Sequence, residues 1–181
     1  MPFQQTSIPD LLIFEPQVWA DERGYFYESY NRATWESAGV RADFVQDNQA
    51  RSTFGVLRGL HYQVGEAAQA KLVRVVEGEV LDVAVDLREK SPTFGEWFSI
   101  RLSAENKRQL FVPRGFAHGY VVLSPTAEFA YKCDNFYSKK DEGGVAFNCP
   151  NLKIDWQIDL NEAILSEKDA VLPHFGKHRA F

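Results

Sequence analysis

The sequence feature that most constrains the fold is a stretch of alternating residues between positions 71 and 87. Residues 71–76 have the pattern of one strand and residues 79–87 that of the returning strand. Between them Gly78 supplies the left-handed backbone conformation that a tight turn requires. Successive side chains of a strand point to opposite sides, so one face of the second strand is wholly apolar. That face comprises Leu81, Val83, Val85 and Leu87. The pattern predicts an antiparallel sheet.

Similar short bursts of alternation continue along the chain, separated by glycine, proline or acidic turns. They cover residues 97–102, 109–112, 118–123 and 128–133, with breaks at 91–95 and 113–115. Strands this short and evenly spaced predict an all-β sandwich or barrel. Helical signals are few. We expect one short helix over Asn31–Ala38, ended by Gly39, and a second short helix that starts at Ser166.

Length and charge narrow the class of protein. The 181 residues, 45% of them hydrophobic, predict a single domain over residues 1–181. A net charge of −5 argues against partners such as nucleic acid or an anionic membrane, so an anionic small molecule would need a local basic pocket. The first residues lack the basic flank of a signal peptide, and no stretch approaches the roughly 20 apolar residues that span a bilayer. With only two cysteines, the chain is expected to be cytoplasmic with reduced thiols.

Two of the four histidines stand beside glycine in strand-like segments. Because glycine has no side chain, a ligand or another backbone can approach closely there. His61 shares its segment with the polar Arg58 and Gln63, which favours a functional role, while His118 serves equally well as a hydrogen-bonded core histidine. Strict alternation places Arg58 and His61 on opposite faces, so a shared site requires a bulge, for which Gly59 is the candidate.

A transition-metal site is the alternative for a barrel with inward histidines, because such metals take three or four His, Cys or carboxylate ligands. The sequence has no His-x-His or Cys-x-x-Cys pair. A metal site would therefore have to be assembled from scattered residues, and we expect none.

Several other polar residues have both a structural and a chemical interpretation. Tyr131 faces the core with Phe129, either as a packed ring or as a proton donor. Lys71 shares a face with inward valines but could be an exposed strand end. Arg23 is either a solvated turn residue or a guanidinium that binds an anionic group through two hydrogen bonds. Asp169 follows Ser166 in a Ser-x-x-Asp pattern, which by itself indicates a helix cap.

The order and spacing of nine short stretches resemble the dTDP-4-dehydrorhamnose 3,5-epimerase family through nearly the whole chain. They are Asp21–Gly24, Phe44–Asn48, Val56–Gln63, Lys71–Arg74, Ser91–Gly95, Leu102–Leu110, Gly115–Gly119, Tyr131–Cys133 and Lys168–Ala170. The resemblance implies a cupin-type jelly-roll β-barrel with a few short peripheral helices. It also implies an enzyme without metal or cofactor, usually a homodimer that shares an N-terminal strand. The substrate implied is dTDP-4-dehydro-6-deoxy-D-glucose, and the product is dTDP-4-dehydro-L-rhamnose, a precursor of dTDP-L-rhamnose.

The same resemblance assigns roles to individual residues. His61 is the base, Tyr131 the acid, Asp169 the support of His61, and Lys71 the cation near the C4 oxygen of the sugar. Further positions contact the substrate. These are Arg23 and Arg58 at the diphosphate, His118 near the sugar ketone, Tyr137 against the thymine or the pocket wall, and Glu28, Gln46, Asn48, Glu142 and Lys168 at the nucleotide or its sugar.

Three alternatives to the double epimerase stay open at this point. The nearest is an epimerase that inverts only C3 or only C5 of such a sugar in a secondary-metabolite pathway. The others are a metal-dependent cupin enzyme and a sugar-binding barrel without catalysis. Ala70 stands where the family commonly has glycine, and the segment after Asp169 matches no pattern that assigns it a role.

Overall fold

The computed structural model describes residues 2–181, and most of its regular structure is β-strand. Neighbouring strands of its sheets are all antiparallel. The larger sheet runs in the order β1 (Phe3–Gln5), β2 (Leu12–Phe14), β10 (Gln109–Val112), β7 (Lys71–Glu77), β12 (Thr126–Cys133) and β5 (Gln46–Thr53). The smaller runs in the order β13 (Glu142–Gly144), β6 (Leu57–Gln63), β11 (Phe116–Val122), β8 (Glu79–Asp86) and β9 (Trp97–Ser103).

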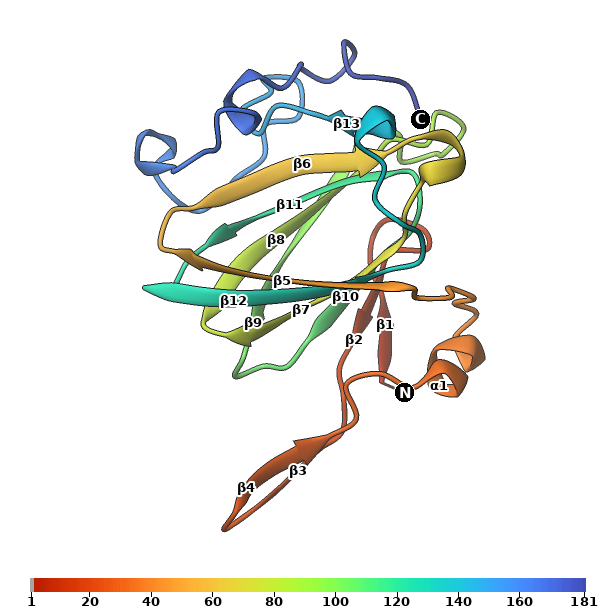
Figure 1. Ribbon diagram of the computed structural model, residues 1–181, viewed down its shortest axis with the longest axis vertical. Coiled ribbons are helices and arrows are strands. Elements are labelled where there is room, and N and C mark those ends of the chain that lie inside the picture. The colour runs from red at the N-terminus through yellow and green to blue at the C-terminus, as the bar shows by residue number, and fades with distance from the viewer. Residues whose placement is uncertain (1) are drawn as a thin grey trace.

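The two sheets face each other as the layers of a sandwich (Figure 1). Among residues 2–181 no strand ladder joins one sheet to the other, so the sheets are not closed into a barrel. The all-β class is confirmed and the closed barrel is wrong. Alternation along each strand predicts which residues are buried, but closure depends on pairing between strands distant in sequence, which alternation does not encode.

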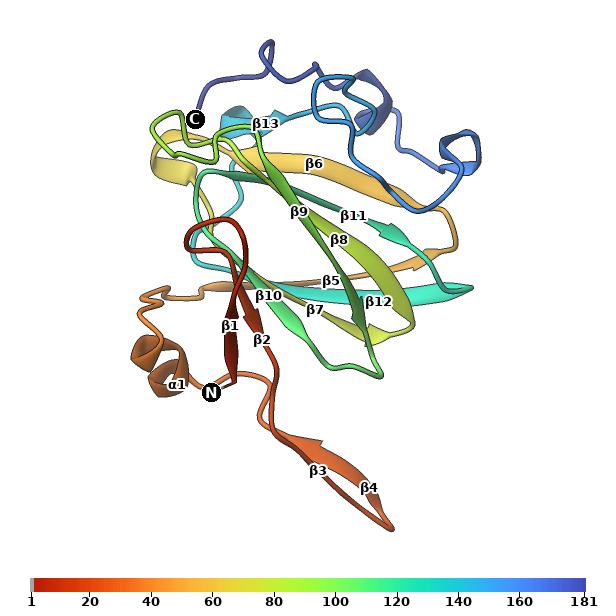
Figure 2. The ribbon, with the colours of Figure 1, turned by 180° about the vertical axis from the view of Figure 1, so that it is seen from behind.

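Apolar residues of both sheets fill the space between them. Phe129 and Val73 of the larger sheet pack with Val80, Ala84 and Val122 of the smaller one. The predicted apolar row that begins at Leu81 is buried on the other face of the smaller sheet, beneath the segment that contains Val145 and Trp156. In Figure 2 this C-terminal segment lies across the outer side of β6 and β11. Both faces of β8 are therefore covered.

The two predicted strands are confirmed as β7 and β8, with Gly78 at φ +75° in the turn. The predicted hairpin pairing is wrong, because β7 belongs to the larger sheet and β8 to the smaller one, and the turn carries the chain from one sheet to the other. A side chain at this position would clash, because a Cβ atom would lie 2.0 Å from the Thr126 carbonyl oxygen. The first predicted helix is also confirmed, as α1 (Arg32–Ser37), whose first turn is capped by the side chain of Asn31. The second predicted helix is only the 3-10 turn η4 (Asp169–Val171). Its single turn is fixed by its contacts to β6 and does not propagate into a helix.

The described residues form three further 3-10 turns, and one hairpin stands apart from the sheets. The turns are η1 (Gly65–Ala67), η2 (Lys139–Asp141) and η3 (Leu160–Glu162). The hairpin of β3 (Val18–Asp21) and β4 (Gly24–Tyr27) projects away from the sandwich in both ribbon views (Figures 1 and 2). Its Trp19, Tyr25 and Phe26 side chains are exposed. In the described part of the chain, no helix combines the length and the apolar character needed to cross a membrane.

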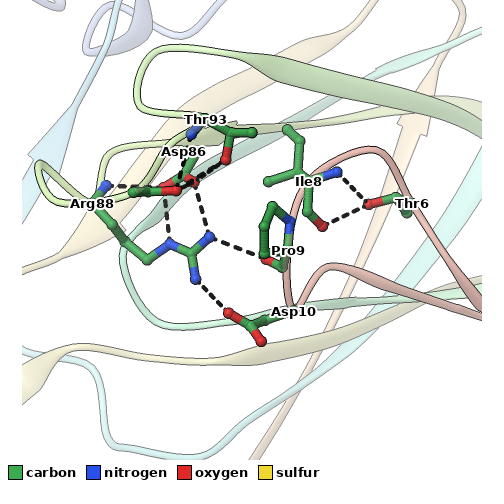
Figure 3. A network of polar contacts seen from close by, with 8 residues as sticks. Thr6, Ile8, Pro9, Asp10, Asp86, Arg88 and Thr93 are labelled. Carbon is green, nitrogen blue, oxygen red and sulfur yellow. Dashed lines mark hydrogen bonds and ion pairs between the residues drawn. The ribbon is translucent and has the colours of Figure 1, made fainter.

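A buried ionic network fixes the end of β8 to the loop between β1 and β2 (Figure 3). The Asp86 carboxylate is fully buried and accepts hydrogen bonds from Arg88, Ser91 and Thr93. Arg88 also donates to Asp10 and to a backbone carbonyl of the loop. Burial alone would raise the pKa of Asp86, but these hydrogen bonds prevail and its pKa is lowered.

Candidate active site

A cavity of about 520 Å³ lies between the two sheets and is lined by most of the predicted catalytic residues. Strands of both sheets and the segment before η4 form its walls. Its polar lining consists of Arg58, His61, Lys71, His118, Tyr120, Tyr131, Ser166, Lys168 and Asp169. Some of these residues are far apart in sequence, with 108 positions between His61 and Asp169, and the sandwich brings them together.

A bulge in β6 gives Arg58 and His61 access to the same cavity. His61 pairs with His118 of β11, whereas Arg58 pairs with Tyr120, so two residues of β6 stand opposite one residue of β11. Gly59 has φ +124°, and a Cβ atom there would lie 2.6 Å from the Cα atom of Gly119. Only glycine fits so close an approach in this conformation. The predicted bulge at Gly59 is confirmed.

His61 is held by a buried carboxylate. Its Nε2 atom lies 2.6 Å from Oδ1 of Asp169, whose side chain has 5% of its surface exposed. Burial works to raise the pKa of Asp169, but the hydrogen bond and charge of His61 outweigh it, and the pKa is lowered. The backbone N–H of Asp169 donates to Ser166 Oγ at 3.1 Å. Asp169 therefore takes part in the predicted cap through its backbone, while its carboxylate serves His61.

A second buried pair, unforeseen in the sequence, stands next to the first. His118 Nε2 lies 2.9 Å from a carboxylate oxygen of Asp82, which is fully buried on β8. Asp82 is the charged residue within the otherwise apolar run of β8, on the face opposite Leu81 and Val83. An acidic residue in a strand buried on both faces is a signal for a polar partner in the interior. His118 is thus hydrogen-bonded within the core and also borders the cavity.

Lys71 and Tyr131 enter the cavity from the larger sheet. Lys71 pairs across the strands with Cys133, two residues from Tyr131 along β12. Burial lowers the pKa of Lys71, because the cation is poorly solvated there. Burial also raises the pKa of Tyr131 to about 12, which keeps its phenol protonated at neutral pH. The predictions that both side chains point inward are confirmed.

Five of the predicted substrate contacts form a second cluster at one end of this site. Gln46 Nε2 donates to Asn48, and the Tyr137 backbone N–H donates to Gln46 Oε1 at 3.2 Å. Tyr137 Oη donates to Glu142 at 3.2 Å, and Glu142 forms an ion pair with Lys168. Lys168 precedes Asp169 in sequence, so this cluster adjoins the His61 pair.

Two predicted contacts lie elsewhere. Arg23 is at the far end of the projecting hairpin, with 89% of its side chain exposed and an ion pair to Asp21. Glu28 is exposed just after the same hairpin. Neither residue lines the cavity of its own chain. Among residues 2–181, no group of three or more His, Cys, Asp or Glu side chains is placed to hold a metal ion.

Comparison with known proteins agrees with this geometry. The family model for dTDP-4-dehydrorhamnose 3,5-epimerase matches residues 5–177. The enzyme of that name from Shigella flexneri is 57% identical over 166 residues, which cover 91% of each protein. A Legionella pneumophila dTDP-6-deoxy-D-glucose-3,5-epimerase, solved with dTDP-4-keto-L-rhamnose, is 49% identical with a TM-score of 0.93, covering 97% of this chain and 93% of that one. A Streptomyces bikiniensis 3′-monoepimerase, solved with dTDP-quinovose, is 33% identical with a TM-score of 0.89, covering 94% and 86%. The chain belongs to the dTDP-4-dehydrorhamnose 3,5-epimerase family.

Proposed function

We propose that the protein is an isomerase that inverts C3 and C5 of dTDP-4-dehydro-6-deoxy-D-glucose and forms dTDP-4-dehydro-L-rhamnose. The observation that carries the proposal is the His61–Asp169 pair, which shares one cavity with Tyr131 and Lys71. A base with a fixed carboxylate behind it, a protonated phenol and a buried cation are the groups that proton transfer beside a ketone requires.

The chemistry follows from the ketone at C4 of the sugar. It acidifies the hydrogens at C3 and C5, because the carbanion left by proton removal is delocalised as an enolate. Neutral His61 removes the proton, and the Asp169 carboxylate stabilises the imidazolium that forms. Lys71 stabilises the negative charge that develops on the C4 oxygen, and His118 adds a polar contact in the same region. Tyr131 then returns a proton to the other face of the carbon, and the stereocentre is inverted.

This route moves only protons, and Lys71 supplies the positive charge that the enolate needs. We therefore propose catalysis without a metal or organic cofactor. Arg58 binds the diphosphate of the substrate. The cluster of Gln46, Asn48, Tyr137, Glu142 and Lys168 binds the nucleotide or its sugar. This local set of cationic and polar groups serves an anionic substrate despite the acidic total of the chain.

We further propose a homodimer in which the projecting hairpin reaches the partner's site. Trp19 and Phe26 expose apolar surface on this hairpin, which monomeric proteins rarely present in a group. Arg23 and Glu28 lie far from the cavity of their own chain, so their predicted substrate contacts require a second copy. Sedimentation equilibrium tests the dimer, and the mass of a single chain would refute it.

The fold proposal is a cupin-type jelly roll that acts as one domain, here in the form of an open sandwich. Cys133 and Cys149 are both free and buried. Reduced cysteines are usual in a reducing compartment, and we propose the cytoplasm as the site of action.

Double inversion is favoured over inversion of one carbon. The relative of 57% identity and the structure of 49% identity are both named for 3,5-epimerisation, whereas the monoepimerase shares 33%. The test is incubation with dTDP-4-dehydro-6-deoxy-D-glucose in deuterated water, followed by NMR of C3 and C5. Deuterium at both carbons with inversion supports the proposal. Deuterium at one carbon indicates a single-site epimerase, and none at either refutes the function.

The same assay tests the assigned roles. His61→Ala is expected to abolish exchange at both carbons, because one base serves both. Tyr131→Phe is expected to retain exchange while inversion is impaired, because it removes the proton donor of the opposite face. Near-normal exchange in the His61 variant would show that another residue is the base.

A further inference from the structure

Tyr120 presents a buried hydroxyl to the cavity without a hydrogen-bond partner. The residue lies on β11, lines the cavity and is 5% exposed. Its Oη atom is buried and has no hydrogen bond within residues 2–181. Buried polar atoms are nearly always paired in native proteins, so an unpaired one that borders a cavity indicates a group that binds there.

The ring of Tyr120 is fixed in place. It stacks on Phe129 with the ring centroids 4.1 Å apart and the planes 18° apart. Phe129 is itself almost fully buried in the core between the sheets. This packing holds the ring, and with it the hydroxyl oxygen, at the wall of the cavity. The hydroxyl is therefore preorganised for a partner that enters from the cavity.

The neighbouring Arg58 indicates the chemical class of the ligand group that binds the Tyr120 hydroxyl. It stands opposite Tyr120 across β6 and β11. Its Nε and Nη2 atoms both donate to Ser52 Oγ at 3.2 Å, while its Nη1 atom has no hydrogen bond within the described residues. Burial raises the pKa of Tyr120 and outweighs the charge of Arg58 and the nearby polar side chains of Ser52 and Arg58, which act to lower it, so the phenol remains a donor at neutral pH.

We propose that the Tyr120 hydroxyl donates a hydrogen bond to a phosphate oxygen of the bound nucleotide diphosphate, beside Arg58. The inference rests on the proposed function, which places the diphosphate at Arg58. An anionic oxygen accepts from several donors at once, and the Arg58 guanidinium and the Tyr120 phenol supply donors from adjacent strands. Tyr120 is thus a further substrate-binding residue, and it recognises the diphosphate rather than the hexose.

The test compares Tyr120→Phe with wild type by calorimetric titration of dTDP, which lacks the hexose, and by thermal unfolding without ligand. We expect the dissociation constant for dTDP to rise about tenfold or more, since a hydrogen bond to a charged group is lost. The melting temperature of the free protein should stay the same or rise, because the variant removes an unpaired buried hydroxyl.

Tyr62→Phe is the matched control. The Tyr62 hydroxyl donates to the Arg179 carbonyl oxygen at 2.5 Å and does not line the cavity. Its loss should lower the melting temperature and leave dTDP binding unchanged. This result would show that removal of a tyrosine hydroxyl from the fold does not by itself weaken binding.

An unchanged dTDP affinity in Tyr120→Phe would overturn the inference. If the KM for the dTDP-hexose were raised at the same time, the contact would belong to the hexose. If the melting temperature were lowered instead, the hydroxyl would have a structural role. Failure of the proposed function is distinct, because the wild-type protein would then neither bind dTDP nor exchange deuterium into the substrate.

Discussion

Asp169→Asn isolates the contribution of the carboxylate behind His61. The substitution keeps the size of the side chain and removes its charge, at a position where the two side chains are 2.6 Å apart and Asp169 is almost fully buried. A hydrogen bond to a charged group contributes about 1.5–3 kcal/mol. Because this charge helps most when His61 carries the abstracted proton, we expect kcat to fall by about 10-fold to 150-fold. KM should change little.

The assay is the initial rate of deuterium exchange at C3 and C5, measured with saturating substrate. Asp155→Asn is the control, because it removes the same charge from an exposed residue whose carboxylate accepts a hydrogen bond from the backbone N–H of Gln157. Its kcat should equal that of the wild type. A kcat within twofold of wild type for Asp169→Asn would refute the idea that this carboxylate supports the base.

Acid unfolding provides a second measure of the same pair. The pKa of Asp169 is lowered in the folded protein, so its contribution to stability is complete above its ordinary pKa. This contribution is lost as the pH falls below that value and through the lowered pKa. Asp169→Asn should remove this part of the acid dependence, and urea unfolding at several pH values between about 2 and 6 measures it.

Three further predictions concern the charges of Lys71 and Arg88, outside this pair. Lys71→Met should raise the free energy of unfolding at neutral pH, because burial disfavours the Lys71 cation, while exchange is lost. The lowered pKa of Lys71 means that its ammonium loses its proton at a lower pH than an ordinary lysine does. In the wild type, kcat should therefore fall as the pH rises, and the fall should begin below the ordinary lysine pKa of about 10.4. Arg88→Ala should destabilise the protein by about 3–5 kcal/mol in urea unfolding, because it leaves the buried Asp86 carboxylate without its cationic partner. A loss below 1 kcal/mol would contradict the structural role of the network.

The alternation of apolar and polar residues predicts those strands that bury one apolar face in the core. The strands from Lys71 to Asp86 were foreseen because each has an apolar row that packs against the core. Strand β5 was missed because its inward residues include the polar Gln46, Asn48 and Ser52. Those side chains face a site and not a hydrophobic core. The strand therefore lacks the alternation of apolar and polar residues from which strands are predicted.

The residues of the candidate site were predictable from local pattern, whereas the pairing of His61 with Asp169 was implied only by the resemblance to the family. His61 and the Gly59 bulge were visible locally, since glycine and polar residues interrupt a strand pattern there. The partner Asp169 lies 108 residues away, and no spacing rule connects the two. Asp82 was overlooked although a charge within an apolar strand is itself a signal. Arg23 and Glu28 lie outside the cavity of their own chain, which local sequence does not reveal.

The protonation states of Tyr131 and Lys71 are those that would stabilise an anionic intermediate in the cavity. Burial opposes charge and therefore acts in opposite directions on two of the titratable groups that line the cavity: it raises the pKa of Tyr131 to about 12 and lowers the pKa of Lys71. The phenol is thereby kept as a proton donor, while the ammonium lacks full solvation until a negative charge arrives. An enolate oxygen near Lys71 would relieve this cost in the transition state and not in the free enzyme. In the proposed mechanism, the unfavourable burial of Lys71 would thus become differential stabilisation of the transition state, which is the form of binding that accelerates a reaction.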